Sequence, residues 1–389
     1  MRYDLAGAVG LSTDPEVGPR ITRYVRGAMV PYVPSALPTG DSSGDGDGAG
    51  VLRLESLEVG PRPWLDVERS AGDGLTTAWD GDRAYVLSAG RCCAVPDPLR
   101  DEDAAFALEP GFPLGSIWAS LVSPALSVAA LRRDAAVLHS SAVAVGGRAV
   151  LVAGWSESGK TEVALALAET GAAFMSDKWS ILNAGGSVAP FPASVGVRRW
   201  VVPYLPRLSA GLTAAARAQL AGARVAAALA RPLRDRTASG PIVRELSSAA
   251  SSASDIADRI PMTSAAIRRI YGVEGDQCLP VPLAAVVLLT TAPTQGRVSL
   301  EPMSAETMAR RLSQSAAFER RAYFSVAARI SYATDHPVRA SAEEGAEIER
   351  GVLTRLLSGV PLFQARTDFP QDPRPLAGEI REALVRIGS

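Results

Sequence analysis

The sequence predicts an α/β fold, and three observations support this fold class. The 389 residues exceed the roughly 250–300 at which a single hydrophobic core stops growing, so we expect two domains. Residues 148–177 run as an apolar strand, a glycine-rich turn, a helix and a second strand. Residues 283–290 have the apolar pattern of a buried strand, and a helix that Ser304 opens follows them. Strands that alternate with helices are typical of a largely parallel sheet.

Residues 1–134 differ in character from the rest of the chain. They are rich in Gly and Pro, and residues 51–57 and 84–87 have the short apolar patterns of strands. Small and apolar residues at 117–133 predict a helix, which Pro124 is expected to kink or break. We therefore expect a smaller N-terminal α+β domain, in which no motif points to a chemical role.

Residues 135–389 are predicted to form the second domain. Its expected elements are a strand at 137–145, a hairpin turn at Gly146-Gly147, a strand at 148–153, a helix at 162–169, a strand at 172–177, an Ala-rich helix at 208–231 and a helix from 304 to about 332. A helical insertion over about 200–275 and C-terminal helices complete the domain. Runs of small polar residues at 40–50 and 247–254 predict flexible surface connections.

Composition and charge exclude several classes of protein. A hydrophobic fraction of 47% with 21% charged residues is typical of a folded globular chain. The 40 basic and 41 acidic residues give a net charge of −1, so no nucleic-acid partner is expected. The apolar run at 281–289 is about half as long as a membrane span and contains Pro282, and the N-terminus lacks the apolar core of a signal peptide.

Cys92, Cys93 and Cys278 lack metal-ligand spacing and are expected to be free thiols. We expect a cytoplasmic protein that does not enter a membrane.

Only two of the basic residues are lysines, Lys160 and Lys178, and all others are arginines. The codon bias of a GC-rich genome is the simplest explanation of this scarcity. A lysine retained under such a bias is still informative, because a planar guanidinium does not replace a compact ammonium in a tight site. Both lysines lie in the one segment that carries a recognisable motif.

That segment matches the P-loop pattern G-x-x-x-x-G-K-[ST], directly after a predicted strand and at the start of a predicted helix. The matching residues, which we predict to bind a nucleotide, are Gly154, Trp155, Ser156, Glu157, Ser158, Gly159, Lys160 and Thr161. The glycines let backbone N–H groups converge on phosphate oxygens at the helix N-terminus. Lys160 is expected to hold the β- and γ-phosphates of ATP, and the Thr161 hydroxyl to ligate Mg²⁺. The alternative is a chance match in a Gly-rich chain.

Two residues outside the loop are candidates for the chemistry. Asp177 ends the predicted strand 172–177, and in a parallel sheet it would emerge at the edge where ligands bind. It is our candidate for holding the metal or orienting the nucleophile, the alternative being an Asp that only ends a strand. His139 lies on the strand before the hairpin, where a lone His is more often a core or edge residue than a functional one.

Residues 138–179 resemble the catalytic core of the HPr kinase/phosphorylase family. In that family a His opens the strand before a hairpin, a P-loop follows, and an acidic pair comes after the P-loop helix. Here His139, the 154–161 loop with Glu162 directly after it, Gly171 and Asp177 stand in the same order and at similar spacing. Beyond this segment only the strand at 281–291 and the helix after it show a looser likeness.

The resemblance implies a P-loop kinase core of HPr kinase type that uses ATP and Mg²⁺ to phosphorylate a hydroxyl. By that likeness Asp177 is the base that accepts the serine proton, and His139 lies near the transferring phosphate. Some relatives in bacterial gene clusters phosphorylate a serine of a ribosomal peptide precursor. The expected acceptor is therefore a peptide or small protein rather than the carrier protein HPr itself.

The sequence departs from the family pattern at three points. Lys178 stands where the family has a second Asp, Glu157 replaces the middle glycine of the P-loop, and the motif linked to the phosphorylase activity is not recognisable. Two alternatives stay open: a non-catalytic ATP-binding module, which Lys178 favours, and a kinase of a small molecule. Whether the chain forms a homo-oligomer is also left open.

Charged neighbours of the motif receive weaker assignments. An arginine often meets the phosphate charge that develops in transfer, and the candidates are Arg198, Arg199, Arg310, Arg311, Arg320, Arg321 and Arg329. Because nearly every basic residue is an arginine, most of these must be surface charges. Glu162 is interpreted as a first-turn acid that the helix dipole favours. Side chains alternate along a strand, so Lys178 faces away from Asp177 if the strand continues. If the chain turns at the end of the sheet, the Lys178 ammonium reaches the phosphates as a charge clamp, which we favour because both lysines lie in this one motif region.

Overall fold

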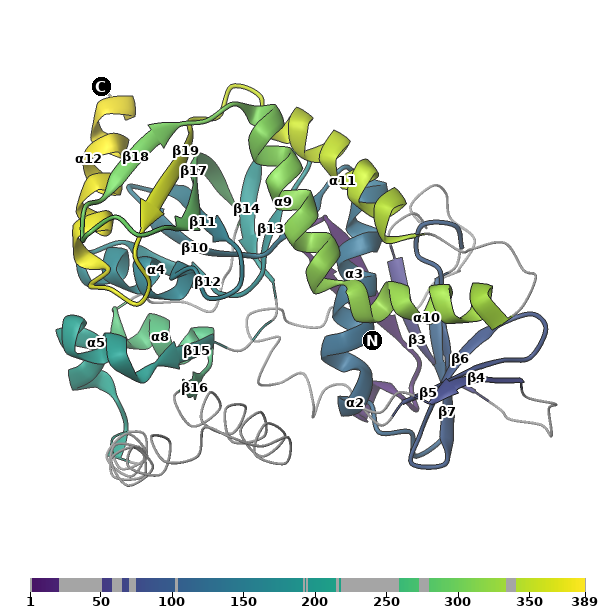
Figure 1. The fold of residues 1–389 in the computed structure, drawn as a ribbon. Coiled ribbons are helices and arrows are strands. Elements are labelled where there is room, and N and C mark those ends of the chain that lie inside the picture. The colour runs from purple at the N-terminus through teal and green to yellow at the C-terminus, as the bar shows by residue number, and fades with distance from the viewer. Residues whose placement is uncertain are drawn as a thin grey trace, which may run out of the picture.

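The computed structural model describes residues 2–20, 51–57, 65–69, 75–101, 104–191, 193, 195–214, 217, 259–272, 280–333 and 341–388. These residues form a mixed α/β fold, as predicted, in which helices cover two larger sheets (Figure 1). The predictions at 40–50, 247–254 and Cys278, and most of the helix predicted at 208–231, lie outside the described residues.

The first sheet has eight strands from the N-terminal part of the chain. They are β1 (Arg2–Leu5), β2 (Val9–Thr13), β3 (Val51–Ser56), β4 (Leu65–Arg69), β5 (Thr76–Trp79), β6 (Ala84–Ser88), β7 (Arg91–Val95) and β8 (Ala105–Leu108). The spatial order is β1-β2-β3-β8-β7-β6-β5-β4, and β3 lies parallel to both its neighbours. Strands β3 and β6 confirm the predictions at 51–57 and 84–87. Cys92 and Cys93 are free and buried in β7.

The helix predicted at 117–133 is present, and its irregular turn comes just before Pro124. Its pieces are α2 (Gly115–Ile117), the π-helical turn η1 (Trp118–Val122), α3 (Ser123–Ala130) and the 3₁₀ turn η2 (Leu131–Arg133). In η1 the N–H of Ser123 donates to the carbonyl of Trp118, five residues earlier. A proline ring clashes with the carbonyl four positions before it in a regular helix, and the wider turn accommodates this clash.

The second sheet has nine strands. They are β9 (Ala136–Leu138), β10 (Ser140–Val145), β11 (Arg148–Gly154), β12 (Ala173–Ser176), β13 (Ser180–Leu182), β14 (Ser187–Pro190), β17 (Val281–Thr291), β18 (Ser299–Pro302) and β19 (Leu362–Thr367). Strand β17 lies parallel to β11 and to β19. Val145 pairs with Arg148, and Gly146 and Gly147 have φ of 57° and 77°, so the predicted two-residue hairpin is confirmed.

Helices cover both faces of the second sheet (Figure 1). On one face lie α4 (Lys160–Glu169) and α12 (Arg374–Gly388), and on the other α9 (Ala305–Glu319) and α11 (Ala342–Leu356). Alternate residues of β11 serve the two faces: Val150 and Val152 pack with α4 and α12, whereas Leu151 and Ala153 pack with α9 and α11. A strand buried on both faces is apolar at nearly every position, which explains the unbroken apolar run that the sequence shows.

The region predicted as a helical insertion over about 200–275 also contains a strand. Its described elements are η3 (Arg199–Tyr204), α5 (Pro206–Gly211), β16 (Arg259–Met262) and α8 (Ser264–Ile270). Strand β16 pairs with β15 (Val195–Arg198) in a two-stranded ribbon. Val195 and Ile260 of this ribbon share a core with α4, so the ribbon lies beside the helix that follows the glycine-rich loop (Figure 1).

The single strand predicted at 137–145 is wrong, because the chain breaks at His139. Strand β9 before the break pairs with β13, whereas β10 after it pairs with β11 and β12. The apolar pattern continues through the break since both halves are buried. Period-two patterning therefore does not show where a strand changes its partners.

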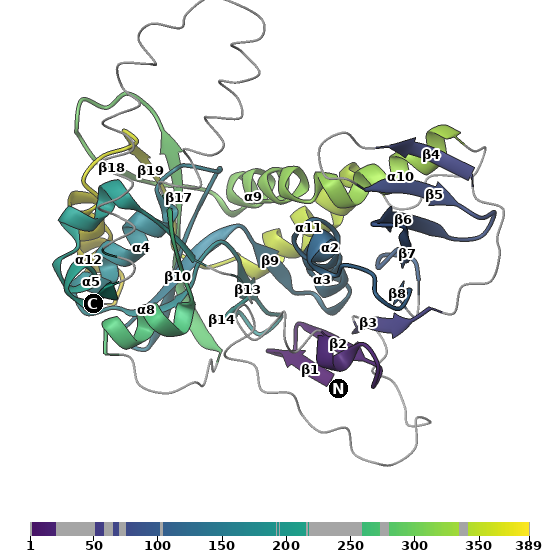
Figure 2. The same cartoon turned by 90° about the horizontal axis from the view of Figure 1, so that it is seen from below.

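The single helix predicted from 304 to about 332 is also wrong in its middle. Ser304 caps α9 as predicted, but α9 ends at Glu319 and α10 (Arg321–Ala333) leaves in another direction (Figure 1), beside strands β4 to β6 (Figure 2). The residue between them, Arg320, is 1% exposed and binds the fully buried Glu349 of α11 through two hydrogen bonds of 3.0 and 2.8 Å. After this break α10 packs on the first sheet, where Tyr323 joins the core of β1–β8.

We expect removal of one partner of the buried Arg320–Glu349 pair to destabilise the fold strongly. Glu349→Ala leaves a buried guanidinium without its counter-charge, which typically costs about 3–5 kcal/mol. Glu347→Ala is the matched control, because Glu347 lies on the same helix but forms an exposed pair with Arg350. An exposed pair contributes less than about 1 kcal/mol. Urea unfolding measures both; equal losses in the two variants would contradict the prediction.

Candidate functional site

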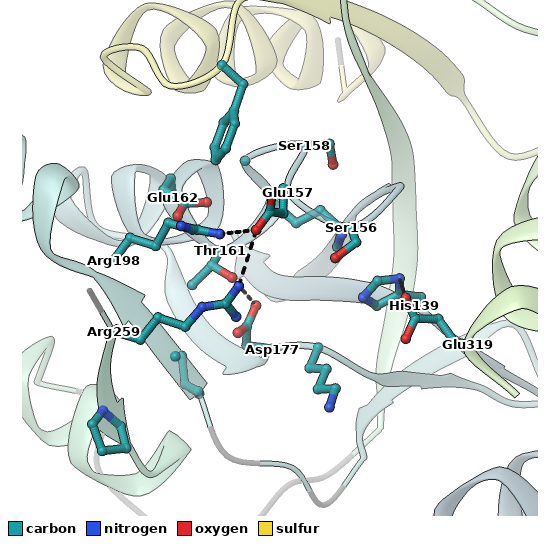
Figure 3. Close-up of a pocket in the computed structure, with 17 residues that line it drawn as sticks. His139, Ser156, Glu157, Ser158, Thr161, Glu162, Asp177, Arg198, Arg259 and Glu319 are labelled. Carbon is teal, nitrogen blue, oxygen red and sulfur yellow. Dashed lines mark hydrogen bonds and ion pairs between the residues drawn. The ribbon is translucent and has the colours of Figure 1, made fainter. Parts of the chain in front are cut away.

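A cavity of about 490 Å³ lies where the glycine-rich loop meets the second sheet (Figure 3). The predicted site residues on its wall are His139, Ser156, Glu157, Ser158, Gly159, Lys160, Thr161 and Asp177. The other two predicted residues, Gly154 and Trp155, lie instead on a second cavity of about 470 Å³. Trp155 is half-exposed and packs against Phe318, with ring centroids 4.7 Å apart and the ring planes tilted by 39°.

Strand directions explain why Asp177 lies at the loop. Strand β12 pairs antiparallel with β10, and β10 pairs antiparallel with β11. Strands β12 and β11 therefore point the same way, and their C-terminal ends meet at one edge of the sheet. Asp177 directly follows β12 at that edge, as predicted, although the antiparallel strand β10 lies between β12 and β11.

The backbone of the 154–161 loop needs glycine at Gly154. Gly154 has φ of 153°, and a Cβ there would lie 2.5 Å from Ser158 Oγ and 2.9 Å from the carbonyl oxygen of Leu289. Glu157 adopts a left-handed φ of 63°, which is uncommon for a residue with a side chain. The Ser158 hydroxyl is buried without a hydrogen-bond partner. The loop is thus tightly folded and holds an unsatisfied polar group.

Lys160 holds a buried positive charge at the centre of the loop. Its Nζ donates to the carbonyl oxygens of Gly154 at 3.1 Å and Trp155 at 2.7 Å. Burial lowers the pKa of Lys160 to about 8, although the charge of Asp177 acts in the opposite direction. An ammonium with little hydration gains more from an arriving anion than an exposed one does.

Asp177 gathers hydroxyl groups around one carboxylate oxygen. Thr161 Oγ1 donates to Asp177 Oδ1 at 2.8 Å, and the Ser141 hydroxyl donates to the same atom. The Asp177 side chain is buried, and Thr161 is the second residue of α4. A carboxylate and a hydroxyl in contact are oxygen ligands of the kind that Mg²⁺ prefers.

His139 is a buried neutral group on the far wall of the cavity from Arg198 (Figure 3). Burial, aided by the charges of Lys160 and Lys178, lowers the pKa of His139 to about 3. Its Nδ1 lies 3.4 Å from Glu319 Oε1 but makes no hydrogen bond. The contact is therefore between a carboxylate and a neutral imidazole, and it is not an ion pair.

Lys178 does not follow the alternation of a strand. Strand β12 ends at Ser176, and Lys178 adopts a left-handed φ of 67°. The turn places the exposed Lys178 on the same cavity as Asp177. Of the two arrangements that the sequence left open, the structure has the second, in which the chain turns at the end of the sheet and Lys178 reaches the cavity.

Glu162 is more than a first-turn acid of the helix. It lies in the first turn of α4, but it is buried on the cavity wall. Burial raises the pKa of Glu162 to about 7, and the charge of Asp177 adds to this effect. A group whose pKa rises on folding contributes stability below its unfolded pKa, and that contribution is lost as the pH rises through its folded pKa.

We expect Glu162→Gln to become more stable relative to wild type as the pH rises. A tenfold change in proton affinity corresponds to about 1.4 kcal/mol, so ionising Glu162 in the folded state costs about 3 kcal/mol. The difference in unfolding free energy between variant and wild type should grow by this order between pH 4 and 8. Chemical unfolding across this pH range measures it, with the exposed Glu379→Gln as control. A constant difference would contradict the prediction.

Sequence reasoning missed several residues of the site. Ser141 donates to Asp177 without lining the cavity, and its place two residues after His139 in the predicted strand 137–145 was the only available signal. Glu319 and Arg259 come from distant elements, and no local pattern marks them. Of the arginines that the sequence singled out, Arg198 reaches the cavity, whereas none of the candidates on α9 and α10 is on its wall in the described chain.

Neither a protein-family model nor a curated protein matches this chain. Among the residues that the structure describes, no group of three or more His, Cys, Asp or Glu side chains is arranged to hold a metal ion. Within the same residues, no helix has the length and apolar character needed to cross a bilayer. The likeness to HPr kinases thus stays a prediction that rests on the motif residues.

Proposed function

We propose that the protein is an ATP- and Mg²⁺-dependent kinase of HPr kinase type, which phosphorylates a serine hydroxyl of a peptide or small protein. The observation that carries this proposal is the 2.8 Å contact between Thr161 and Asp177 beside the Lys160 ammonium. These are the three groups that the sequence assigned to metal, base and phosphate, and they share one cavity. Phosphoryl transfer depends mainly on positioning and charge, which is what such a cluster supplies.

The residues present fit a nucleoside triphosphate. The loop is too tight at Gly154 for any side chain, Ser158 has an unsatisfied hydroxyl, and the N-terminus of α4 adds partial positive charge. Lys160 and the backbone N–H groups of the loop would hold the phosphates. Thr161 and Asp177 would hold Mg²⁺, which when bound neutralises phosphate charge.

Asp177 is the proposed base. Its carboxylate accepts hydrogen bonds from the hydroxyl groups of Ser141 and Thr161. The proposed acceptor is also a hydroxyl group, so the carboxylate is suited to contact it. Accepting the serine proton would leave the acceptor oxygen free to attack phosphorus. Lys178 supplies a positive charge on the cavity wall where the family has an acid, so Asp177 serves alone. His139, neutral at pH 7, can donate one N–H to a phosphate oxygen.

The test measures nucleotide binding and phosphoryl transfer separately. We expect MgATP to bind, and radiolabelled γ-phosphate to move from ATP to serine-containing peptides on an array. Tight MgATP binding without transfer to any hydroxyl acceptor would identify a non-catalytic ATP-binding module. Transfer to small hydroxyl metabolites alone would identify a small-molecule kinase.

A further inference from the structure

One carboxylate of the 154–161 loop is held by two arginines across the cavity. Glu157 accepts a hydrogen bond from Arg198 Nη2 on Oε1, and Arg259 Nη2 lies 3.6 Å from the same oxygen (Figure 3). The Arg198 side chain is 12% exposed, whereas Glu157 is about half-exposed. Arg198 is therefore a fixed part of the wall, and Glu157 is the partner with room to move.

The ribbon β15–β16 is what brings the two arginines together. Arg198 and Arg259 are about sixty positions apart in sequence, yet they are directly paired across the two strands. Like charges opposite each other in a sheet repel, so a nearby anion stabilises such a pair. Glu157 places one carboxylate beside the two guanidiniums, and all three side chains line the cavity.

The position of Glu157 is costly for a side chain that serves only the fold. Its backbone is left-handed, and it lies in the loop whose N–H groups the motif predicts to converge on phosphate oxygens. The Glu157 carboxylate thus lies among cationic groups on one cavity wall. An incoming phosphate chain would meet the same arginines.

We infer that Arg198 and Arg259 form a binding site for the phosphate chain of the nucleotide, and that Glu157 occupies this site until the phosphates displace it. The inference rests on the proposed function and adds the two arginines and the exchange of partner. Arginine is suited to this role, because its planar fork binds carboxylate and phosphate oxygens alike. When the Glu157 contact breaks, both guanidiniums can bind phosphate oxygens of the ligand in its place.

The test uses the full chain with inorganic tripolyphosphate and MgATP as probes in titration calorimetry. We expect Arg198→Ala and Arg259→Ala each to weaken binding of both probes by about tenfold or more, since hydrogen bonds to charged groups are the strong ones. Arg310→Ala, an exposed arginine on α9 away from the cavity, should bind as wild type does. Thermal unfolding confirms that each variant is folded, and Arg198→Lys serves if Arg198→Ala is not.

Glu157→Gln tests the exchange. It should strengthen tripolyphosphate binding several-fold, and this gain should shrink in the Arg198→Ala background, because the competing contact is already gone. Wild-type affinity in both arginine variants, or weaker binding in Glu157→Gln, overturns the inference. If these variants bind normally while Lys160→Met does not, the inference fails and the proposed function stands. If the wild type binds neither probe, both fail.

Discussion

Lys160→Met is expected to lose MgATP affinity by on the order of 10²-fold while the protein stays folded, because charge-assisted hydrogen bonds are worth about 1.5–3 kcal/mol each. The methionine keeps the buried stem and removes only the ammonium that now donates to Gly154 and Trp155. The loss should thus appear in binding, with little change in the unfolding midpoint. Titration calorimetry and thermal unfolding measure the two quantities.

Lys160→Arg distinguishes charge from geometry. The Nζ position is set by two carbonyl oxygens at 3.1 and 2.7 Å inside a buried loop, and a guanidinium is too broad for it. We expect the arginine variant to fail nearly as badly as Lys160→Met. Wild-type affinity and turnover in Lys160→Arg would show that Lys160 is not a phosphate ligand, and the P-loop assignment would then be wrong.

Asp177→Asn is expected to lower phosphoryl transfer by about 10²-fold or more with little change in nucleotide affinity. The amide oxygen still accepts the hydrogen bonds that Ser141 and Thr161 now make to Asp177 Oδ1. What disappears is the negative charge, and with it the proposed base and the stronger of the two proposed metal ligands, Asp177 and Thr161. Steady-state transfer to a peptide acceptor and MgATP binding are measured together.

Ser141→Ala is the matched control for Asp177→Asn. It removes one donor to the carboxylate and leaves the charge in place, so transfer should fall far less. Equal losses in the two variants would mean that the hydrogen-bond network, and not the carboxylate charge, carries the effect. Wild-type transfer in Asp177→Asn would remove Asp177 from the mechanism.

The division of the chain at residue 134 stays a prediction, but one contact across it is clear. Helix α10 comes from the C-terminal part and packs on the first sheet, where Tyr323 donates to the carbonyl of Pro96 at 2.7 Å. No pattern in residues 321–333 distinguishes a helix that covers its own sheet from one that covers another. Amphipathic patterning shows that a face is buried, and it does not show against what.

The sequence by itself determined the parts that depend on neighbouring residues. The hairpin at Gly146-Gly147, the 154–161 loop between strand and helix, and the cap at Ser304 follow from backbone preferences that a few adjacent residues set. Asp177 could be placed at the loop because a strand direction and a sheet edge follow from that local order. The part of the site that the motif supplies, the 154–161 loop with Asp177 beside it, was therefore predictable from the sequence.

Only the tertiary structure decided the features that depend on distant partners. The strand ends before His139, because β9 pairs with β13, and the helix ends before Arg320, because Arg320 binds Glu349. At both positions the distant partner outweighs a local pattern that continues unbroken. The tertiary structure also brought Arg259 and Glu319 to the cavity from elements far away in sequence. The physical reason is that burial and ion pairing act between surfaces that meet only after folding, so no local window of the sequence contains both partners.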